Sequence, residues 1–155
     1  MVTPYLLSKE ELEELFEKSR ISPRRRAVKI FQEDSYPGPH LGLNVIQPGS
    51  YIRPHFRDSD EHIIYYSGNL CSLLFNSEGK ITHKISISRQ NPYFLLPKET
   101  FHSVVSLEEN SSIWFVIQGP HNPNKFSEYL SSSPDEKGDY QAYFNWLEKI
   151  AKETI

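Results

Sequence analysis

Closely spaced turn signals through the middle of the chain restrict its fold more than any other feature. Between residues 27 and 118, short stretches rich in Val, Ile, Tyr and Phe are separated by turn-forming residues, mainly Pro and Gly. This spacing leaves room for short strands between turns and not for long helices. The chain is therefore expected to be all-β, a sandwich or barrel of antiparallel strands. The predicted strands lie near residues 27–32, 41–47, 51–57, 61–67, 70–76, 80–88, 93–96, 102–107 and 112–118.

Helices are predicted at both ends of this β-rich region. In the first, Ser8 and Glu11 form a capping-box pattern ahead of an apolar stripe that contains Leu15. In the second, aromatic and aliphatic residues recur at helical spacing, which is typical of a face that packs on a core. The predicted organisation is one domain over 1–155, with a helix at 8–20, a barrel at 27–118, a connector at 119–138 and a helix at 139–153.

Composition argues against several classes of function. The formal net charge of −3 gives no electrostatic case for binding nucleic acid. No apolar run approaches the roughly 20 residues of a membrane helix, and the N-terminal residues lack the features of a signal peptide. The single cysteine, Cys71, fits a reducing compartment. We therefore expect a cytoplasmic protein whose partner is a small molecule, and no contact with nucleic acid or membrane.

Strand alternation gathers polar side chains on one face of the third predicted strand. Tyr51, Arg53, His55 and Arg57 occupy its odd positions, and alternate residues of a strand point to the same side. Glu61 follows a tight turn, which brings its carboxylate back beside His55 on the next strand. These residues are therefore candidates for a site inside the barrel.

Two stretches resemble the motifs of the cupin superfamily. The first motif covers residues 49–68, and its positions are occupied in order by Gly49, His55, Arg57, Glu61 and Gly68. Arg57 stands where the motif has its second histidine. Residues 97–102 resemble the second motif. Glu99 takes the place of its glycine, and His102 is its final residue.

Residues 24–136 are similar to the WbuC-type cupin-fold metalloproteins, small bacterial proteins whose namesake lies among genes for O-antigen assembly. The resemblance implies a double-stranded β-helix barrel, or jelly roll. It implies a divalent transition metal, Fe, Mn, Zn or Ni, held by His55, Glu61 and His102. It also implies action on a sugar or nucleotide-sugar in surface-polysaccharide metabolism. Where the family has further polar residues, this chain offers Ile30 and Gln32 on the entry strand and Phe115 shortly before the Gly-Pro dipeptide.

Arg57 leaves three interpretations of the site open: a retained metal, a metal-free ligand site, and a purely structural relic that binds neither. A guanidinium cannot ligate a metal ion and repels one nearby. If the metal is retained, Arg57 and Arg53 would orient an anionic substrate, with Tyr51 and Tyr65 as further candidates for hydrogen bonds to it. If Arg57 pairs with Glu61, the pocket would be a metal-free, non-catalytic site for a small anionic or sugar-like ligand. The sequence leaves open whether the chain is an enzyme and predicts no catalytic residue.

Three other patterns complete the expectations. The basic run at 24–26 indicates either an anion-binding patch or a solvated strand edge. His40 and His121 are candidates for the mouth of the barrel. The apolar outer strand face and the aromatic C-terminal helix together predict a homodimer.

Overall fold

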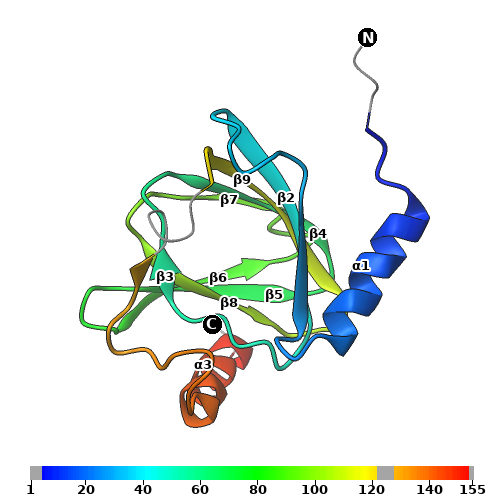
Figure 1. Cartoon of the computed structure of the whole chain (residues 1–155). Helices are drawn as coiled ribbons and strands as arrows, with labels where there is room; N and C mark the ends of the chain where they lie inside the picture. The colour runs from blue at the N-terminus through cyan, green and yellow to red at the C-terminus, as the bar shows by residue number, and fades with distance from the viewer. Residues whose placement is uncertain (1–4, 122–127, 154–155) are drawn as a thin grey trace.

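Two antiparallel sheets that face each other make up most of the molecule (Figure 1). The structure is a computed structural model, and it describes residues 5–121 and 128–153. In the first sheet the strand order is β1-β2-β9-β4-β7. Its strands are β1 (Arg26–Ile30), β2 (Pro39–Ile46), β4 (Glu61–Ser67), β7 (Tyr93–Leu96) and β9 (Ser111–Gln118).

The second sheet has the strand order β10-β3-β8-β5-β6. Its strands are β3 (His55–Phe56), β5 (Leu70–Phe75), β6 (Ile81–Ile87), β8 (Phe101–Ser106) and β10 (Glu128–Tyr129). Strands far apart in the sequence are neighbours in both sheets, since β2 pairs with β9 and β3 pairs with β8. The predicted all-β barrel with a helix at each end is confirmed.

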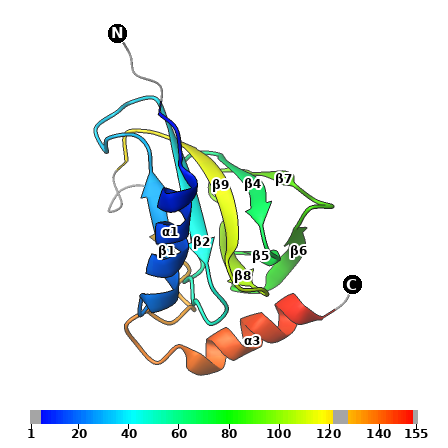
Figure 2. The same cartoon turned by 90° about the vertical axis from the view of Figure 1, so that its right-hand side faces the viewer.

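Helix α1 (Lys9–Ile21) packs against the outside of β1 and β2 (Figure 2). The predicted capping box is present, because Glu11 N–H donates to Ser8 Oγ at 3.1 Å and Ser8 N–H donates to Glu11 Oε2 at 3.0 Å. Leu15 is buried beside Leu43 and Val45 of β2. The helix therefore covers one half of the outer face of the first sheet.

Helix α3 (Gln141–Lys152) covers part of the second sheet, against β5 and β8. Its buried residues Phe144, Leu147 and Ala151 join a core cluster that also contains Tyr51. The Tyr51 ring stacks on that of Tyr140 at 4.6 Å between centroids. Among the described residues, no helix is long and apolar enough to cross a membrane.

The strand predicted at 51–57 is longer than the strand observed, because only His55 and Phe56 pair in β3. Pro54 has no N–H to donate to a sheet ladder. The carbonyl groups before it are satisfied elsewhere, since the Ser103 hydroxyl donates to Ile52 O at 2.6 Å and the Arg26 guanidinium donates to Tyr51 O at 2.9 Å. Within the connector predicted at 119–138, residues 128–129 form β10, and residues 122–127 lie outside the described part of the chain.

We predict that Leu147→Ala lowers the free energy of unfolding by about 2–5 kcal/mol, because this fully buried leucine fills the interface between α3 and the second sheet. Urea denaturation followed by circular dichroism measures the change. Leu6→Ala is the matched control, since Leu6 is 81% exposed and its truncation should shift the value by no more than about 0.5 kcal/mol. Equal effects of the two substitutions would contradict the assignment of α3 to the core.

Candidate functional site

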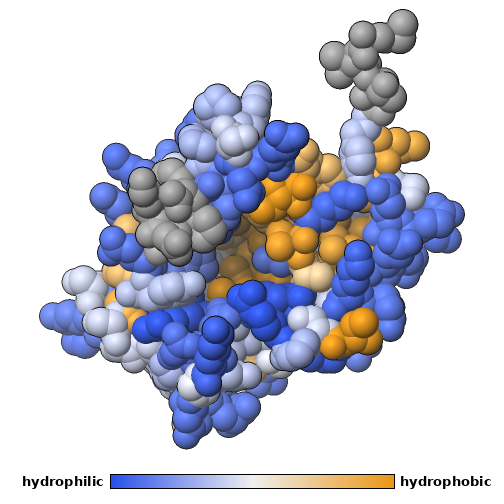
Figure 3. All heavy atoms as spheres, viewed as in Figure 1, coloured by the Kyte–Doolittle hydropathy of each residue, from blue (hydrophilic) through white to orange (hydrophobic). Residues whose placement is uncertain are grey.

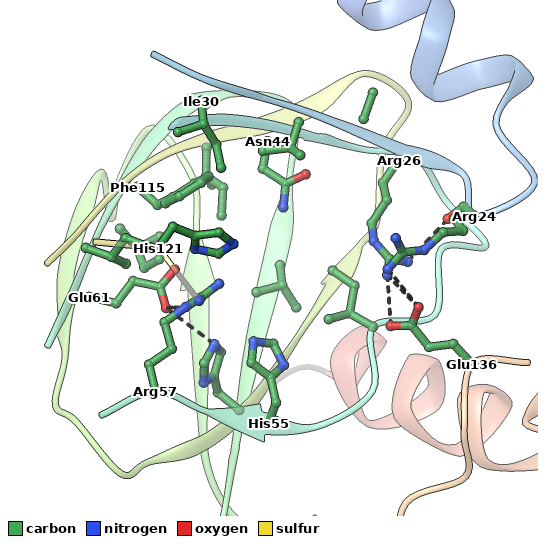
Figure 4. A pocket seen from close by; sticks show the side chains of 18 of the residues that line it. Arg24, Arg26, Ile30, Asn44, His55, Arg57, Glu61, Phe115, His121 and Glu136 are labelled. Carbon is green, nitrogen blue, oxygen red and sulfur yellow. Dashed lines mark hydrogen bonds and ion pairs between the residues drawn. The ribbon is translucent and has the colours of Figure 1, made fainter. Parts of the chain in front are cut away.

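A cavity of about 380 Å³ lies inside the barrel. It shows as an apolar hollow with a hydrophilic rim in the space-filling view (Figure 3). Polar side chains gather at two ends of the cavity, with aliphatic and aromatic residues between them (Figure 4). The lining residues used below are Arg24, Arg26, Ile30, Asn44, Ile52, His55, Arg57, Glu61, Ile63, His102, Val104, Phe115, His121, Tyr129 and Glu136.

Two histidines form the floor of one end. His55 of β3 and His102 of β8 are register partners, and their rings lie 4.5 Å apart between centroids. His55 Nδ1 is 2.9 Å from the carbonyl oxygen of Arg53, and His102 Nδ1 is 3.1 Å from that of Thr100. A carbonyl oxygen can only accept a hydrogen bond, so each ring carries a proton on Nδ1. In the neutral ring Nε2 is then an acceptor.

Both imidazoles are held in the neutral form. Burial lowers the pKa of His55 well below its usual value of 6.5, and the neighbouring His102 and Arg57 lower it further. Burial also lowers the pKa of His102, although the Glu61 carboxylate acts in the opposite direction. The pair therefore presents lone pairs, and not N–H donors, at both Nε2 atoms near neutral pH.

An ion pair stands beside the histidines. Glu61, the first residue of β4, is 7% exposed, and its Oε2 lies 3.4 Å from Arg57 Nε. The same oxygen lies 3.7 Å from His102 Nε2. Figure 4 shows the Arg57 side chain reaching across toward Glu61 above the histidine rings. The pairing that the sequence left open is therefore the one observed.

The donor set does not fit a divalent metal. The described residues contain no group of three His, Cys, Asp or Glu side chains placed to hold an ion. The two imidazoles have the protonation that ligation needs, but the Glu61 carboxylate faces a guanidinium. An ion bound to Oε2 at about 2.1 Å would lie within about 5.5 Å of Arg57 Nε. At an effective dielectric near 20, the repulsion would be about 6 kcal/mol before relaxation.

The opposite end of the cavity is built around Glu136. Arg26 donates to both oxygens of this carboxylate at 2.8 Å, and Arg24 donates to Oε2 at 2.8 Å. Although burial raises the pKa of Glu136, the two guanidinium groups lower it by more, so the pKa falls below its usual value. Within the basic run at 24–26, Arg26 is mostly buried and paired with Glu136, whereas the paired Arg24 side chain is 65% exposed.

The middle of the cavity is mainly apolar, although the amide of Asn44 also lies there (Figure 4). Phe115 is 6% exposed and faces Gly42 across the β2–β9 pair. A Cβ atom at position 42 would collide with the Phe115 ring, so glycine is needed there to admit the aromatic side chain. Ile30 and Phe115 therefore occupy wall positions where the family resemblance led us to look for polar ligands.

The remaining predicted binding residues do not line the cavity. Tyr51 is buried under α3, where its hydroxyl donates to Pro134 O at 2.8 Å. Arg53 pairs with Asp135 at 3.5 Å and lies over the Tyr129 ring. Tyr65 packs against the core cluster between the sheets. The alternation that grouped Tyr51 and Arg53 with His55 does not hold, because β3 begins only after Pro54.

Several lining residues were missed or only partly anticipated. His121 and His40 were both expected near the barrel mouth, and His121 lines the cavity. His40 is fully buried, and its Nε2 donates to Tyr36 O at 2.7 Å. Asn44 and Glu136 line the cavity but were not predicted as site residues. Alternation within β2, where Asn44 follows Gly42 by two residues, was the available signal for the first.

We predict that Glu136→Gln lowers the free energy of unfolding by about 1–3 kcal/mol at pH 7, because it leaves Arg26 without its charged partner. The folded-state pKa of Glu136 is depressed, so its contribution is complete above the ordinary value of 4.5 and is lost as pH falls through the lower folded value. The stabilities of the two proteins should therefore approach each other as the pH falls below 4.5. The exposed Glu109→Gln is the control in the same urea titrations. A difference between wild type and Glu136→Gln that is independent of pH would contradict the charge assignment.

Comparison with solved structures identifies the fold as the cupin jelly roll. A protein of Shewanella oneidensis is 14% identical, with a TM-score of 0.58 over 81% of this chain and 86% of that one. The L-ribose isomerase of Cellulomonas parahominis is 12% identical, with a TM-score of 0.56 over 69% and 70% of the two chains. A cupin superfamily protein of Desulfitobacterium hafniense is 9% identical, with a TM-score of 0.50 over 60% and 76%.

Sequence comparison gives a narrower result. No curated protein matches the chain. The family described as "Domain of unknown function (DUF6016)" matches residues 7–87, which include His55, Arg57 and Glu61. The match covers more than half of the sequence, and the protein therefore belongs to the DUF6016 family.

Proposed function

We propose that this protein binds a small carboxylic acid in its barrel, with the carboxylate at Arg57 and the body of the ligand against the apolar wall. The observation that carries the proposal is a fixed guanidinium at one end of a cavity whose middle is formed by Ile52, Val104 and Phe115. The Arg57 side chain is 19% exposed, so its charge acts in surroundings of low dielectric.

The charges of the cavity favour an acid as ligand. Three guanidinium groups, those of Arg24, Arg26 and Arg57, line it against two carboxylates, those of Glu61 and Glu136. With neutral histidines the described lining carries a net positive charge. Glu61 contacts Arg57 through Nε, which orients the planar guanidinium, and guanidinium–carboxylate hydrogen bonds are strong and directional.

The size and polarity of the cavity limit the ligand further. A volume of about 380 Å³ is near the lower end of the range for small-molecule sites, roughly 300–1,000 Å³. A free sugar has a hydroxyl on nearly every carbon, and the hydroxyls that face Ile52, Val104 and Phe115 would lose their hydrogen bonds to water. An acid group attached to an aliphatic or aromatic body matches both parts of the cavity.

The finer implications of the WbuC resemblance remain predictions. They are membership of that subfamily and a sugar or nucleotide-sugar substrate in O-antigen metabolism, whereas the Arg57–Glu61 ion pair argues against the divalent metal predicted at His55, Glu61 and His102. The L-ribose isomerase among the similar structures is named for a sugar, but at 12% identity it carries the fold alone. The Arg57 guanidinium at one end of the cavity and the apolar wall favour the acid over the sugar.

We predict that hexanoate and benzoate bind to the purified protein and that Arg57→Gln weakens their binding by about 10–100-fold, since a hydrogen bond to a charged group contributes about 1.5–3 kcal/mol. Isothermal titration calorimetry measures the dissociation constants. Arg89→Gln is the control, because Arg89 is an exposed arginine outside the cavity. Absence of binding by both acids, or equal binding in Arg57→Gln, would contradict the proposal.

The same preparation, purified without a histidine tag, tests the predicted metal. Elemental analysis should find no stoichiometric Fe, Mn, Zn or Ni if Arg57 has taken the place of the ion. One equivalent of metal that disappears in His55→Ala and His102→Ala would instead support the metal centre and contradict an acid site centred on Arg57.

We also propose that two copies of the chain associate through the outer face of β4 and β7. Ile64 and Tyr93 are register partners there, and Tyr66 and Leu95 extend the same exposed apolar surface. We predict a dimer by sedimentation velocity at micromolar concentration and a shift to monomer in Ile64→Lys. Ile21→Lys, at an exposed position of α1, is the control. A strict monomer of the wild-type protein would rule this interface out.

A further inference from the structure

Three hydrogen-bond acceptors lie together at the polar end of the cavity. The Nε2 atoms of His55 and His102 are acceptors, because each ring uses its Nδ1 proton on a backbone carbonyl. The third acceptor is Glu61 Oε2, which is buried and accepts no hydrogen bond from the described residues. Arg57 Nε, at 3.4 Å, contributes charge to this oxygen without the geometry of a hydrogen bond.

The three groups are neighbours, and Glu61 Oε2 is the acceptor among them that is buried without a hydrogen-bond partner in the described residues. Glu61 Oε2 is 3.7 Å from His102 Nε2, and the His102 ring is 4.5 Å from that of His55. Lone pairs at this separation repel each other unless a donor lies between or beside them. A buried acceptor without a donor is unfavourable, and native proteins rarely leave one without a reason such as a bound ligand.

A carboxylate alone cannot supply the missing donors. It is itself only an acceptor, so it can satisfy Arg57 but adds lone pairs next to those of His55, His102 and Glu61. The ligand therefore needs a donor group close to its acid group.

The number and charge of the acceptors distinguish between donor groups. A hydroxyl has one donor and two lone pairs of its own, whereas an ammonium group has three donors and no acceptor. Two neutral imidazoles and one carboxylate match the ammonium group in number, and the Glu61 carboxylate matches it in charge. With the ligand's carboxylate at Arg57, positive and negative groups alternate around the end of the cavity, which is favourable at low dielectric.

We infer that the ligand is an apolar 2-amino acid, with its carboxylate at Arg57, its ammonium group at Glu61, His55 and His102, and its side chain against Phe115. This inference rests on the proposed function and specifies the class of acid that the same site takes.

Three ligands of equal chain length test the inference on the wild-type protein. They are norleucine, which has the 2-amino group, 2-hydroxyhexanoate, which has a hydroxyl in its place, and hexanoate, which has neither. We expect calorimetry to give a dissociation constant for norleucine at least 10-fold lower than for the other two. Hexylamine, which lacks the acid, should bind at least 10-fold more weakly than norleucine.

A variant separates the role of Glu61 from that of the acid site. Glu61→Gln should abolish the preference for norleucine over hexanoate, measured as the ratio of the two dissociation constants within the same variant, and the exposed Glu109→Gln should keep the preference. The comparison of ligands on the wild-type protein stands even if Glu61→Gln fails to fold.

Each other outcome decides a different point. Equal binding of norleucine and hexanoate would overturn the amino-acid inference and leave the acid site in place, and tightest binding of 2-hydroxyhexanoate would do the same. Failure of all three acids to bind would overturn the proposed function itself. A stoichiometric metal in the purified protein would overturn the inference by supplying another partner for the three acceptors.

Discussion

The ion pair between Arg57 and Glu61 decides what the interior of this barrel can hold. Both side chains are largely buried, so neither charge is screened by water as it would be on the surface. The pair fixes a cation where a metal ion would otherwise lie and directs the Glu61 carboxylate toward it. The neighbouring histidines stay neutral, because burial and the Arg57 charge both lower the pKa of their imidazoles. One guanidinium thereby changes the chemistry available to an otherwise ordinary cupin barrel.

The apolar wall gives that charge its effect. Ile63, Val104 and Phe115 belong to the core cluster between the two sheets, and the same residues line the cavity. The cavity is therefore a part of the core that was left unfilled, and Gly42 shows how closely the wall is packed around it. A ligand with an apolar body would bury surface there much as a core side chain does, which is worth about 25 cal/mol per Å² of apolar area.

Local patterns predicted the parts of the structure that depend on neighbours in the sequence. The capping box located α1, and the turn signals separated the strands well enough to identify the barrel. The motif spacing predicted that His55, Glu61 and His102 lie close together, and in the structure His102 is next to both of the others. The same rule failed for Arg53, where Pro54 ends the ladder. Glu136 was not predicted as a site residue, since it meets Arg26 across 110 residues of sequence.

The contact between Arg26 and Glu136 helps to position His55 in the site. β3, which carries His55, pairs through only two residues and is held between β8 and β10. The segment after β10 leads to Glu136, whose carboxylate is bound by Arg24 and Arg26 and also accepts from the backbone N–H of Arg53 at 3.3 Å. Arg53 in turn provides the carbonyl that fixes the His55 tautomer. The charged cluster at one end of the cavity thus holds in place the backbone that orients the imidazole at the other, so the two polar ends are linked through the backbone of Arg53.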